Sequence, residues 1–342
     1  MAEKRTLSIV VPLYNSAATL ADLLDRLEAV LPRIAREYEI ILVNDGSPDE
    51  TWTRVQEELP RRSRVVAIDM MRNFGQHNAL LCGVRAARYE IVVTMDDDLQ
   101  HPPEEIPRLI DKLGEGYDVV YGIARAQQHG LWRNLASRLT KLALQSAMGA
   151  STARDVSAFR AFRTVLREAF TTYRSPFVSI DVLLTWGTTR FAALPVRHDP
   201  RRVGESNYTF GKLVSHALDM LTGFSNLPLR LASGIGFGFT LFGLGVLAYV
   251  LGRYVIEGGS VPGFPFLASI IAIFSGAQLF ALGIMGEYLA RVHVRSMGRP
   301  DYVVRGVAVS DDWEEPSPAL ADAGDGRATR PDSFTAGGGE NG

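Results

Sequence analysis

The chain has 342 residues, 46% of them hydrophobic, and a formal net charge of -2 at pH 7. This length and apolar content can bury a full core and support more than one region, whereas the near-neutral charge gives no reason to expect nucleic acid as a partner. The single cysteine, Cys82, excludes an internal disulfide framework and fits a reducing compartment. Its apolar neighbours favour a helix core position over a reactive thiol. No long apolar run follows the charged N-terminus, so we expect no cleavable signal peptide.

Strand and helix patterns alternate through residues 1–125. Strands are predicted at residues 7–11, 40–43, 64–70, 90–95 and 118–121, and helices at residues 19–30 and 79–87. Residues 44–49 have the composition of a turn that caps a further helix. This alternation predicts an α/β fold with a mainly parallel sheet and helices on both faces.

Two later segments combine an apolar helical face with basic residues. Residues 127–148 have the composition of a helix in a membrane interface, although packing against the α/β domain explains it nearly as well. Residues 212–224 have a similar pattern and lead into a long apolar segment. We therefore expect juxtamembrane amphipathic helices before that segment.

Two apolar segments, residues 231–252 and 258–286, contain no charged residue. At about 1.5 Å per residue each is long enough to cross a bilayer, and two in tandem favour transmembrane helices over buried helices of a soluble protein. Positive charge flanks the pair at Lys212, Arg230, Arg291, Arg295 and Arg299, while the connection between them holds only Arg253 and Glu257. This asymmetry predicts that the α/β domain and both termini are cytoplasmic.

These patterns divide the chain into six regions. They are an α/β domain (1–210), a juxtamembrane amphipathic helix (211–230), transmembrane helices (231–256 and 262–290), a cytoplasmic segment (291–305) and a disordered tail (306–342).

An acidic run follows directly on the β-branched residues 91–94. Asp96, Asp97 and Asp98 would lie at the carboxyl end of a buried strand, where open α/β sheets bind their ligands. Hard carboxylate oxygens there suit Mg²⁺ or Mn²⁺ bridging a diphosphate. The alternative is a solvated acidic loop, which the preceding strand and the following Pro-Pro-Glu-Glu helix start make less attractive.

Two further loops are predicted at the same edge of the sheet. In the first, Pro12 and Tyr14 offer a rigid turn and an aromatic ring for a nucleoside base, and in the second, Asp45 offers an acceptor for a base or ribose. Each alone is also ordinary turn chemistry, so their shared position carries the interpretation. Two histidines beside turns, His77 and His101, are interpreted as hydrogen-bonded structure in preference to ligands.

Six segments in order carry a resemblance to a known family. They are residues 11–15 (VPLYN), 43–47 (VNDGS), 73–77 (NFGQH), 95–105, 157–160 (SAFR) and 201–208 (RRVGESNY). With residues 283–288 (GIMGEY) after the apolar pair, the chain resembles glycosyltransferase family 2, and within it the polyprenyl-phosphate glycosyltransferase branch.

The resemblance implies a GT-A fold that binds a nucleoside diphosphate sugar and inverts its anomeric centre. By motif position the metal site is Asp96, Asp98 and Gln100, the nucleotide site is Pro12, Tyr14, Asn15, Asp45, Asp96 and Asp97, and Asp96, Asp98 and Arg201 are the catalytic residues. The family also implies a homo-oligomer.

Cationic side chains are expected to hold an acceptor phosphate, because arginine matches phosphate oxygens. The candidates are Arg125, Arg201 and Arg202, with Ser206 in the loop that the family uses for phosphate, although any one of these arginines could be a plain surface residue. Three positions depart from the family pattern, namely Ser16 for Glu, Asn44 for a first Asp, and Asn207 for Lys.

The resemblance thus implies metal-dependent transfer from a nucleotide sugar, with bacterial members favouring UDP-sugars, to undecaprenyl phosphate at the cytoplasmic face of the inner membrane. The product would be a lipid-linked monosaccharide for cell-envelope glycosylation.

One alternative is a processive or polymer-directed member of the family, but the sequence lacks the Gln-x-x-Arg-Trp motif that is typical of those members. Another alternative is a non-catalytic membrane component that binds lipid-linked sugar. Such a protein would not need the acidic run. A sugar-nucleotide pyrophosphorylase is weaker still, because no Gly-rich phosphate loop opens the first strand-helix turn.

Overall fold

The computed structural model describes residues 5–124, 156–175, 178–199, 227–257 and 263–313. These residues form two compact units. The first unit draws on three stretches of the chain, before residue 130, between residues 151 and 207, and from residue 299 onward. The second unit contains the two long apolar helices. The predicted amphipathic helices at 127–148 and 212–224 lie outside the described residues.

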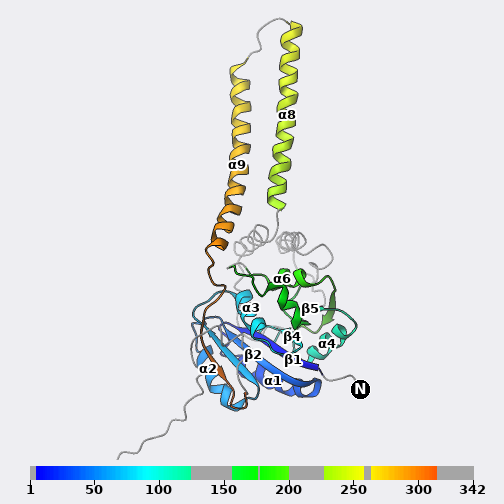
Figure 1. Cartoon of the computed structure of the whole chain (residues 1–342), viewed down its shortest axis with the longest axis vertical. Helices are drawn as coiled ribbons and strands as arrows, with labels where there is room; N and C mark the ends of the chain where they lie inside the picture. The colour runs from blue at the N-terminus through cyan, green and yellow to red at the C-terminus, as the bar shows by residue number, and fades with distance from the viewer. Residues whose placement is uncertain (1–4, 125–155, 176–177, 200–226, 258–262, 314–342) are drawn as a thin grey trace, which may run out of the picture. The chain divides into compact units, whose positions relative to one another are not determined.

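The first unit is built on an eight-stranded sheet in the order β7-β5-β6-β4-β1-β2-β3-β8. Figure 1 labels β1, β2, β4 and β5 of this sheet. Its strands are β1 (Arg5–Leu13), β2 (Ala35–Asn44), β3 (Val65–Met70), β4 (Ile91–Thr94), β5 (Val119–Ala124), β6 (Arg160–Arg163), β7 (Phe191–Val196) and β8 (Val304–Val309). The pairs of β1 with β2, β1 with β4, β2 with β3 and β5 with β7 are parallel. Strand β6 runs antiparallel to β4 and β5, and β8 runs antiparallel to β3. The prediction of a mainly parallel α/β sheet is therefore confirmed.

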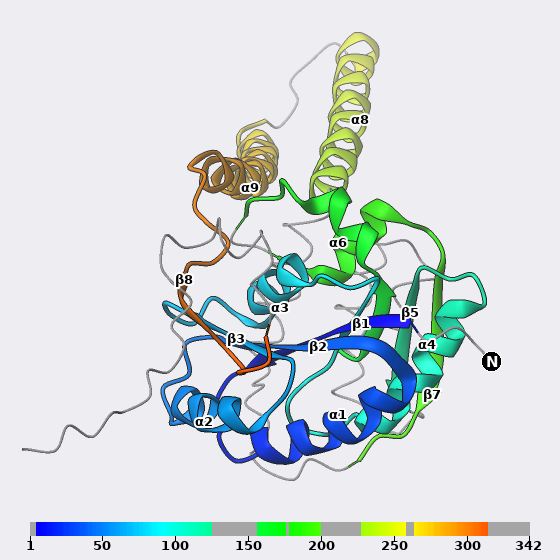
Figure 2. The same ribbon diagram turned by 60° about the horizontal axis from the view of Figure 1, so that its bottom comes forward.

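Helices cover both faces of this sheet (Figure 2). They are α1 (Leu20–Ile34), α2 (Thr51–Glu58), α3 (Gln76–Ala86), α4 (Ile106–Gly114) and α6 (Ile180–Gly187), with 3-10 turns η1 (Leu59–Arg61), η2 (Pro103–Glu105) and η4 (Thr164–Phe170). The main core lies under α1, α2 and α4, where alternate residues of β1 such as Leu7, Ile9 and Val11 point. Helices α3 and α6 lie on the opposite face (Figure 2).

Helix α1 shows why the sequence folds this way locally. Leu20, Leu23, Leu24, Leu27 and Leu31 are all buried, and their spacing of three and four residues places them on one helical face. Removing each leucine from water contributes about 2 kcal/mol. The helix passes directly into the extended residue at its carboxyl end, so β2 starts without a loop.

Helix α3 packs closely on the other face because Gly83 has no side chain. A Cβ at Gly83 would lie 2.4 Å from Cγ1 of Val10, which is closer than real contacts allow. Cys82, the preceding residue, is buried in the same helix, and burial raises the pKa of its thiol to about 12. The expected core role for Cys82 agrees with this position.

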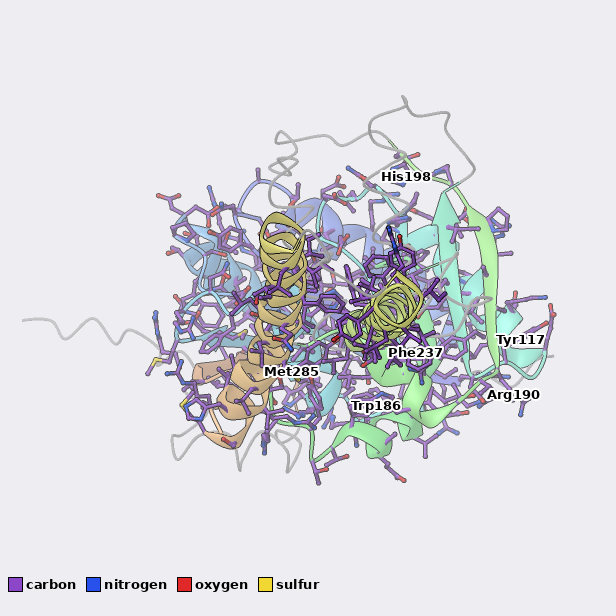
Figure 3. All side chains as sticks on the ribbon, turned by 90° about the horizontal axis from the view of Figure 1, so that it is seen from above. Tyr117, Trp186, Arg190, His198, Phe237 and Met285 are labelled. Atoms are coloured by element: carbon purple, nitrogen blue, oxygen red, sulfur yellow. The ribbon has the colours of Figure 1, made fainter. Side chains whose placement is uncertain are left out.

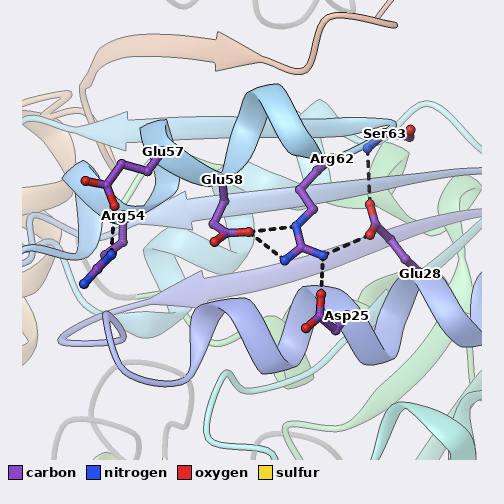
Figure 4. Close-up of polar contacts among 7 residues, drawn as sticks. All are labelled: Asp25, Glu28, Arg54, Glu57, Glu58, Arg62 and Ser63. Atoms are coloured by element: carbon purple, nitrogen blue, oxygen red, sulfur yellow. Dashed lines mark hydrogen bonds and ion pairs between the residues drawn. The ribbon is translucent and has the colours of Figure 1, made fainter.

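An arginine cluster ties α1 to the turn after α2 (Figure 4). Arg62 donates to Glu58 Oε2 at 2.6 and 2.8 Å, to Glu28 Oε2 at 3.1 Å and to Asp25. The backbone N–H of Ser63 completes the cluster by donating to Glu28. Burial lowers the pKa of Arg62, but the three carboxylates outweigh it and raise that pKa above its ordinary value. The cluster joins α1, the end of α2 and the residues that follow η1.

Two strands depart from the predicted boundaries. Strand β1 is longer than the predicted residues 7–11, because it runs from Arg5 to Leu13 with Pro12 paired opposite Val43. Strand β8 lies where the disordered tail was predicted to begin at residue 306, so that boundary is wrong for residues 306–313. These residues are ordered because β8 pairs along β3 and Trp313 is buried beneath the guanidinium of Arg88, 4.0 Å from the ring centroid.

The second unit contains α8 (Leu227–Glu257) and α9 (Phe264–Ser296). Residues Pro228–Ile256 and Ile273–Ser296 are long and apolar enough to cross a membrane, with mean hydropathies of 1.9 and 1.3. None of either apolar window is buried in the structure, unlike a core helix of a soluble protein. Figure 3 labels one side chain on each helix, Phe237 of α8 and Met285 of α9, and both are exposed.

The two apolar helices contact each other at a glycine. The ring of Phe274 on α9 lies over Gly243 on α8, where a Cβ would be 3.0 Å from the ring, and it also meets Phe239 edge to face at 5.7 Å. Helix α8 starts at Leu227, inside the region predicted as juxtamembrane, and α9 continues to Ser296, past the predicted end at 290.

Candidate active site

The candidate site lies where four parallel strands end side by side. Leu13 at the end of β1 pairs with Asn44 of β2, Asn44 pairs with Asp69 of β3, and Val10 of β1 pairs with Thr94 of β4. The loops that follow these strands carry the residues predicted to bind nucleotide and metal. The structure therefore brings the acidic run and both predicted nucleotide loops to one edge of the sheet, where open α/β sheets bind ligands.

The loop after β1 is shaped by its own backbone. Tyr14 is 49% exposed, and its N–H donates to the hydroxyl of Ser16 at 2.9 Å. Asn15 adopts a φ of 57°, a conformation that asparagine tolerates better than most residues, and its N–H donates to Ser47 Oγ at 3.2 Å. Pro12 is buried, so it supports the loop from below while Tyr14 is available to a ligand. Ser16, which departs from the family pattern, is buried and shapes the loop.

Asp45, directly after β2, makes contacts that the sequence did not predict. It is 3% exposed, and its two carboxylate oxygens accept backbone N–H groups of Phe74 at 2.7 Å and Gly75 at 2.9 Å. Burial raises the pKa of Asp45, while those two hydrogen bonds and Arg72 oppose the rise. Asp45 was expected to face a base or ribose, but its contacts in the structure hold the loop between β3 and α3.

Gly46 lets the β2 and β3 loops approach each other. Its φ is 59°, and a Cβ there would lie 2.4 Å from the carbonyl carbon of Arg72 and 2.5 Å from the nitrogen of Asn73. Both the backbone conformation and the contact require glycine.

The acidic run forms the loop after β4. Asp96, Asp97 and Asp98 are all partly exposed, and buried Leu99, with a φ of 58°, anchors the loop. Asp96 Oδ1 accepts a hydrogen bond of 2.6 Å from Nε2 of Gln76, and Asp98 Oδ1 accepts the backbone N–H of Gln100 at 3.1 Å.

The side chains of this loop carry the hard oxygen atoms that a divalent cation prefers. Within the part of the chain that the structure describes, no group of three or more His, Cys, Asp or Glu side chains could hold a metal by itself. Asp96 and Asp98 supply two carboxylates and Gln100 an amide oxygen. Mg²⁺ is commonly held by one or two carboxylates together with substrate phosphates. The donor set therefore fits a cation whose remaining ligands come from a diphosphate.

A buried ion pair supports the strand beneath the acidic run. Arg160 on β6 pairs with Asp181 and donates to Thr94 Oγ1 at 3.0 Å, and the hydroxyl of Tyr121 donates to Asp181 at 3.1 Å. Thr94 in turn donates to the carbonyl of Ala158 at 2.8 Å. Burial, followed by the charge of Asp181, raises the pKa of Tyr121 well above its ordinary value. The network fixes the last residue of β4, two positions before Asp96.

Two histidines meet beside Gln100. The ring of His101 stacks on Phe159 at 5.4 Å and meets the ring of His198 edge to face at 5.0 Å. Burial, then the charge of His198, lowers the pKa of His101 to about 4, although Asp98 acts in the opposite direction. Nδ1 of His198 is buried without a hydrogen-bond partner among the described residues. His77 Nδ1 accepts the backbone N–H of Ile180 at 3.4 Å, as expected for a structural histidine.

Several supporting residues escaped sequence reasoning. Asp69 and His198 lie outside the segments that carry the family resemblance, and Gln76 lies within one of them, residues 73–77, without an assigned role. Only the fold brings these three residues near the site loops. Arg125, Arg201, Arg202 and Ser206, predicted to bind the acceptor phosphate, lie outside the described residues.

Comparison with known proteins agrees with the fold. A mainly parallel sheet with an acidic loop at its carboxyl edge is a GT-A-like α/β fold, and residues 8–172 match the glycosyl transferase family 2 profile. The chain belongs to glycosyltransferase family 2, and is a glycosyltransferase.

The similarity to curated relatives extends over nearly the whole chain. An undecaprenyl-phosphate 4-deoxy-4-formamido-L-arabinose transferase of Pseudomonas aeruginosa (strain LESB58) is 37% identical over 320 residues, 93% of this chain and 94% of that protein. A transferase of the same name from Klebsiella pneumoniae (strain 342) is 33% identical, covering 89% of this chain and 94% of the relative.

Among solved structures, glucosyl-3-phosphoglycerate synthase of Mycobacterium tuberculosis in complex with Mn²⁺, UDP-glucose and phosphoglyceric acid has a TM-score of 0.48 and 23% identity. That comparison covers 64% of this chain and 78% of the synthase.

Proposed function

We propose that this enzyme transfers a sugar from a nucleoside diphosphate sugar to a polyprenyl phosphate, with inversion at the anomeric carbon. The observation that carries the proposal is the extent of the similarity to undecaprenyl-phosphate 4-deoxy-4-formamido-L-arabinose transferases, which spans 93% of the chain. Such coverage includes the apolar helices as well as the sheet unit. The acceptor we propose is undecaprenyl phosphate, and the first donor to test is the UDP-linked formamido-arabinose.

The chemistry requires leaving-group stabilisation more than base catalysis. The acceptor phosphate oxygen is already anionic near neutral pH, so it can attack C1 while the bond from C1 to the diphosphate oxygen breaks. A new C1–O–P linkage forms and the nucleoside diphosphate departs with the electron pair. Asp96, Asp98 and Gln100 would hold Mg²⁺ or Mn²⁺, which supplies Lewis-acid stabilisation of the departing diphosphate.

The other residues at the sheet edge orient the donor. Tyr14 presents an exposed ring to a nucleoside base, and Asp45 fixes the loop beside it through Phe74 and Gly75. Arg125, Arg201, Arg202 and Ser206 remain our candidates for the acceptor phosphate, because guanidinium groups match its oxygens.

The path of the chain supports a two-span topology. The sheet unit precedes α8, and the chain returns to the same sheet as β8 after α9. If both helices cross the membrane, the segments before and after them lie on one side, as an even number of crossings requires. The basic residues that flank the pair favour the cytoplasmic side of the inner membrane.

The experiment is a transfer assay with single-residue controls. Purified full-length protein is incubated with undecaprenyl phosphate and labelled nucleotide sugars, with Mg²⁺, Mn²⁺ or EDTA, and label extracted into organic solvent is counted. We expect Asp98→Ala to abolish transfer while its thermal unfolding stays close to that of the wild type. Near-normal activity of this variant would exclude the proposed metal site.

A further inference from the structure

The strand that follows the second apolar helix carries a bulge beside the candidate site. Gly306 pairs with Asp69 and Val304 pairs with Met70, so Arg305 is an extra residue between the two pairs. Bulges of this kind redirect side chains and occur often near active sites. Arg305 Nη2 donates to the carbonyl of Met71 at 2.8 Å, and Nη1 lies 3.4 Å from Asp69 Oδ2.

Asp69 connects Arg305 to the loops at the sheet edge. It is 3% exposed, and its Oδ1 accepts a hydrogen bond of 2.6 Å from Nδ2 of Asn44. Burial raises the pKa of Asp69, while Asn44 and Arg305 oppose the rise. Because a carboxylate can only accept, Asp69 fixes which way the Asn44 amide faces.

The amide oxygen of Asn44 then faces the next loop. It accepts the N–H of Ser47 at 3.3 Å, and the hydroxyl of Ser47 accepts the N–H of Asn15 at 3.2 Å. A chain of polar contacts therefore runs from Arg305 through Asp69 and Asn44 to the loop that presents Tyr14. It crosses the ends of four adjacent strands, β8, β3, β2 and β1.

We propose that Arg305 is a positioning residue for nucleotide binding, acting through Asp69 and Asn44 on the loops after β1 and β2. The inference rests on the proposed function, since it assumes that these loops bind the donor nucleotide. According to this inference, strand β8, which follows the second apolar helix, contributes to binding of the donor nucleotide.

If Arg305 only stabilised the fold, its removal would lower the unfolding temperature. Its side chain is 59% exposed, and ion pairs with exposed partners contribute little to folding stability. Loss of Arg305 should therefore leave the unfolding temperature nearly unchanged. Loss of Arg305 should instead shift the Asn44 amide, because the position of this amide depends on the charge and orientation of Asp69.

A matched control lies on the same segment. Asp312 accepts the backbone N–H of Arg64 at 3.0 Å and the hydroxyl of Ser310 at 2.8 Å, so it holds the segment near the opposite end of β3. Asp312→Ala should loosen the segment without touching the chain of contacts from Arg305 to Asn15.

The experiment measures UDP and GDP binding to the full-length protein with Mn²⁺ by calorimetry. For the nucleotide that the wild type binds, we expect Arg305→Ala to raise Kd roughly tenfold, as loss of a charged hydrogen bond predicts, and Arg305→Lys to recover part of the loss. Asp312→Ala should bind like the wild type. In steady state, Arg305→Ala should raise the KM for the donor and leave the KM for the lipid acceptor unchanged.

A second variant tests the middle of the chain. Asn44→Asp would place two carboxylates within 2.6 Å of each other, so it should weaken nucleotide binding at least as much as Arg305→Ala. Equal Kd values for the wild type and Arg305→Ala would overturn the inference, as would equal losses in Arg305→Ala and Asp312→Ala. If the wild type bound neither nucleotide, the proposed function would fail together with the inference.

Discussion

Gln76, the first residue of α3, donates a hydrogen bond of 2.6 Å from Nε2 to Oδ1 of Asp96. The contact joins the loop after β3 to the acidic loop after β4. Asp45 accepts hydrogen bonds from the two residues just before Gln76, so the loops after β2, β3 and β4 are connected at this point. Partners of this kind orient metal-binding carboxylates and influence cation affinity.

Gln76→Ala should therefore weaken cation use without unfolding the protein. We expect about a tenfold rise in the Mn²⁺ concentration that gives half-maximal transfer, because Asp96 loses the group that orients it. Gln76 is exposed, so the unfolding temperature should change little. A titration of activity against Mn²⁺ measures the effect, and an unchanged half-maximal concentration would show that Gln76 does not position Asp96.

His101 should make stability depend on pH in a defined window. Its pKa in the folded chain is about 4, below the ordinary value of 6.5, so between these values the unfolded chain binds a proton that the folded chain does not. Stability should fall as the pH is lowered through this window, by about 2 to 3 kcal/mol in all. His101→Phe keeps a ring beside Phe159 and should flatten this part of the profile of unfolding temperature against pH. A profile as steep as that of the wild type would assign the dependence to other groups.

The Arg62 cluster and a nearby surface pair offer a matched comparison (Figure 4). Arg62 is 11% exposed and contacts three carboxylates, whereas Arg54 and Glu57 are both more than half exposed. Arg62→Ala should lower the free energy of unfolding by about 2 to 3 kcal/mol, and Arg54→Ala by less than about 0.5 kcal/mol. Chemical denaturation of both variants provides the measurement. Similar losses would mean that burial of Arg62 adds nothing to its ion pairs.

Arg160 and Asp181 form a buried pair whose members should not be removed singly. Arg160→Leu leaves the Asp181 carboxylate buried without its partner and should destabilise the protein by about 3 to 5 kcal/mol. Arg160→Leu combined with Asp181→Leu removes both charges and should be more stable than the single variant. Thermal unfolding of the two variants decides the matter, since a double variant less stable than the single one would contradict this view of the pair.

The sequence contained much of the fold because local patterns and tertiary structure agree there. Residues 7–11 and 40–43 are apolar runs that become β1 and β2, and the leucine spacing of residues 19–30 becomes the buried face of α1. The acidic run follows β4 as predicted, because a strand end is visible from its β-branched residues.

Strands β6 and β8 could not be read in the same way. Strand β6 has the sequence RAFR, and Arg160 is buried only because Asp181, distant in sequence, neutralises it. Strand β8 is short and precedes residues of low complexity, so its order depends on pairing with β3 more than 200 residues earlier in the chain. Both are cases of tertiary contacts deciding structure where local propensity is weak.

At the candidate site, the sequence indicated several of the residues but not the contacts between them. The carboxylates Asp96 and Asp98 and the exposed ring of Tyr14 could be proposed from motifs alone. The hydrogen bonds of Asp45 to Phe74 and Gly75 could not, because they depend on how closely the β2 and β3 loops approach at Gly46.

The most direct test of the central claim is transfer of label from a nucleotide sugar to undecaprenyl phosphate by the purified full-length protein. We predict label in the organic phase for one donor, lost with EDTA, restored by excess Mn²⁺ and absent in Asp98→Ala. Metal and nucleotide binding without lipid label from any donor would contradict the account, and would direct attention to a polymer acceptor or a non-catalytic role.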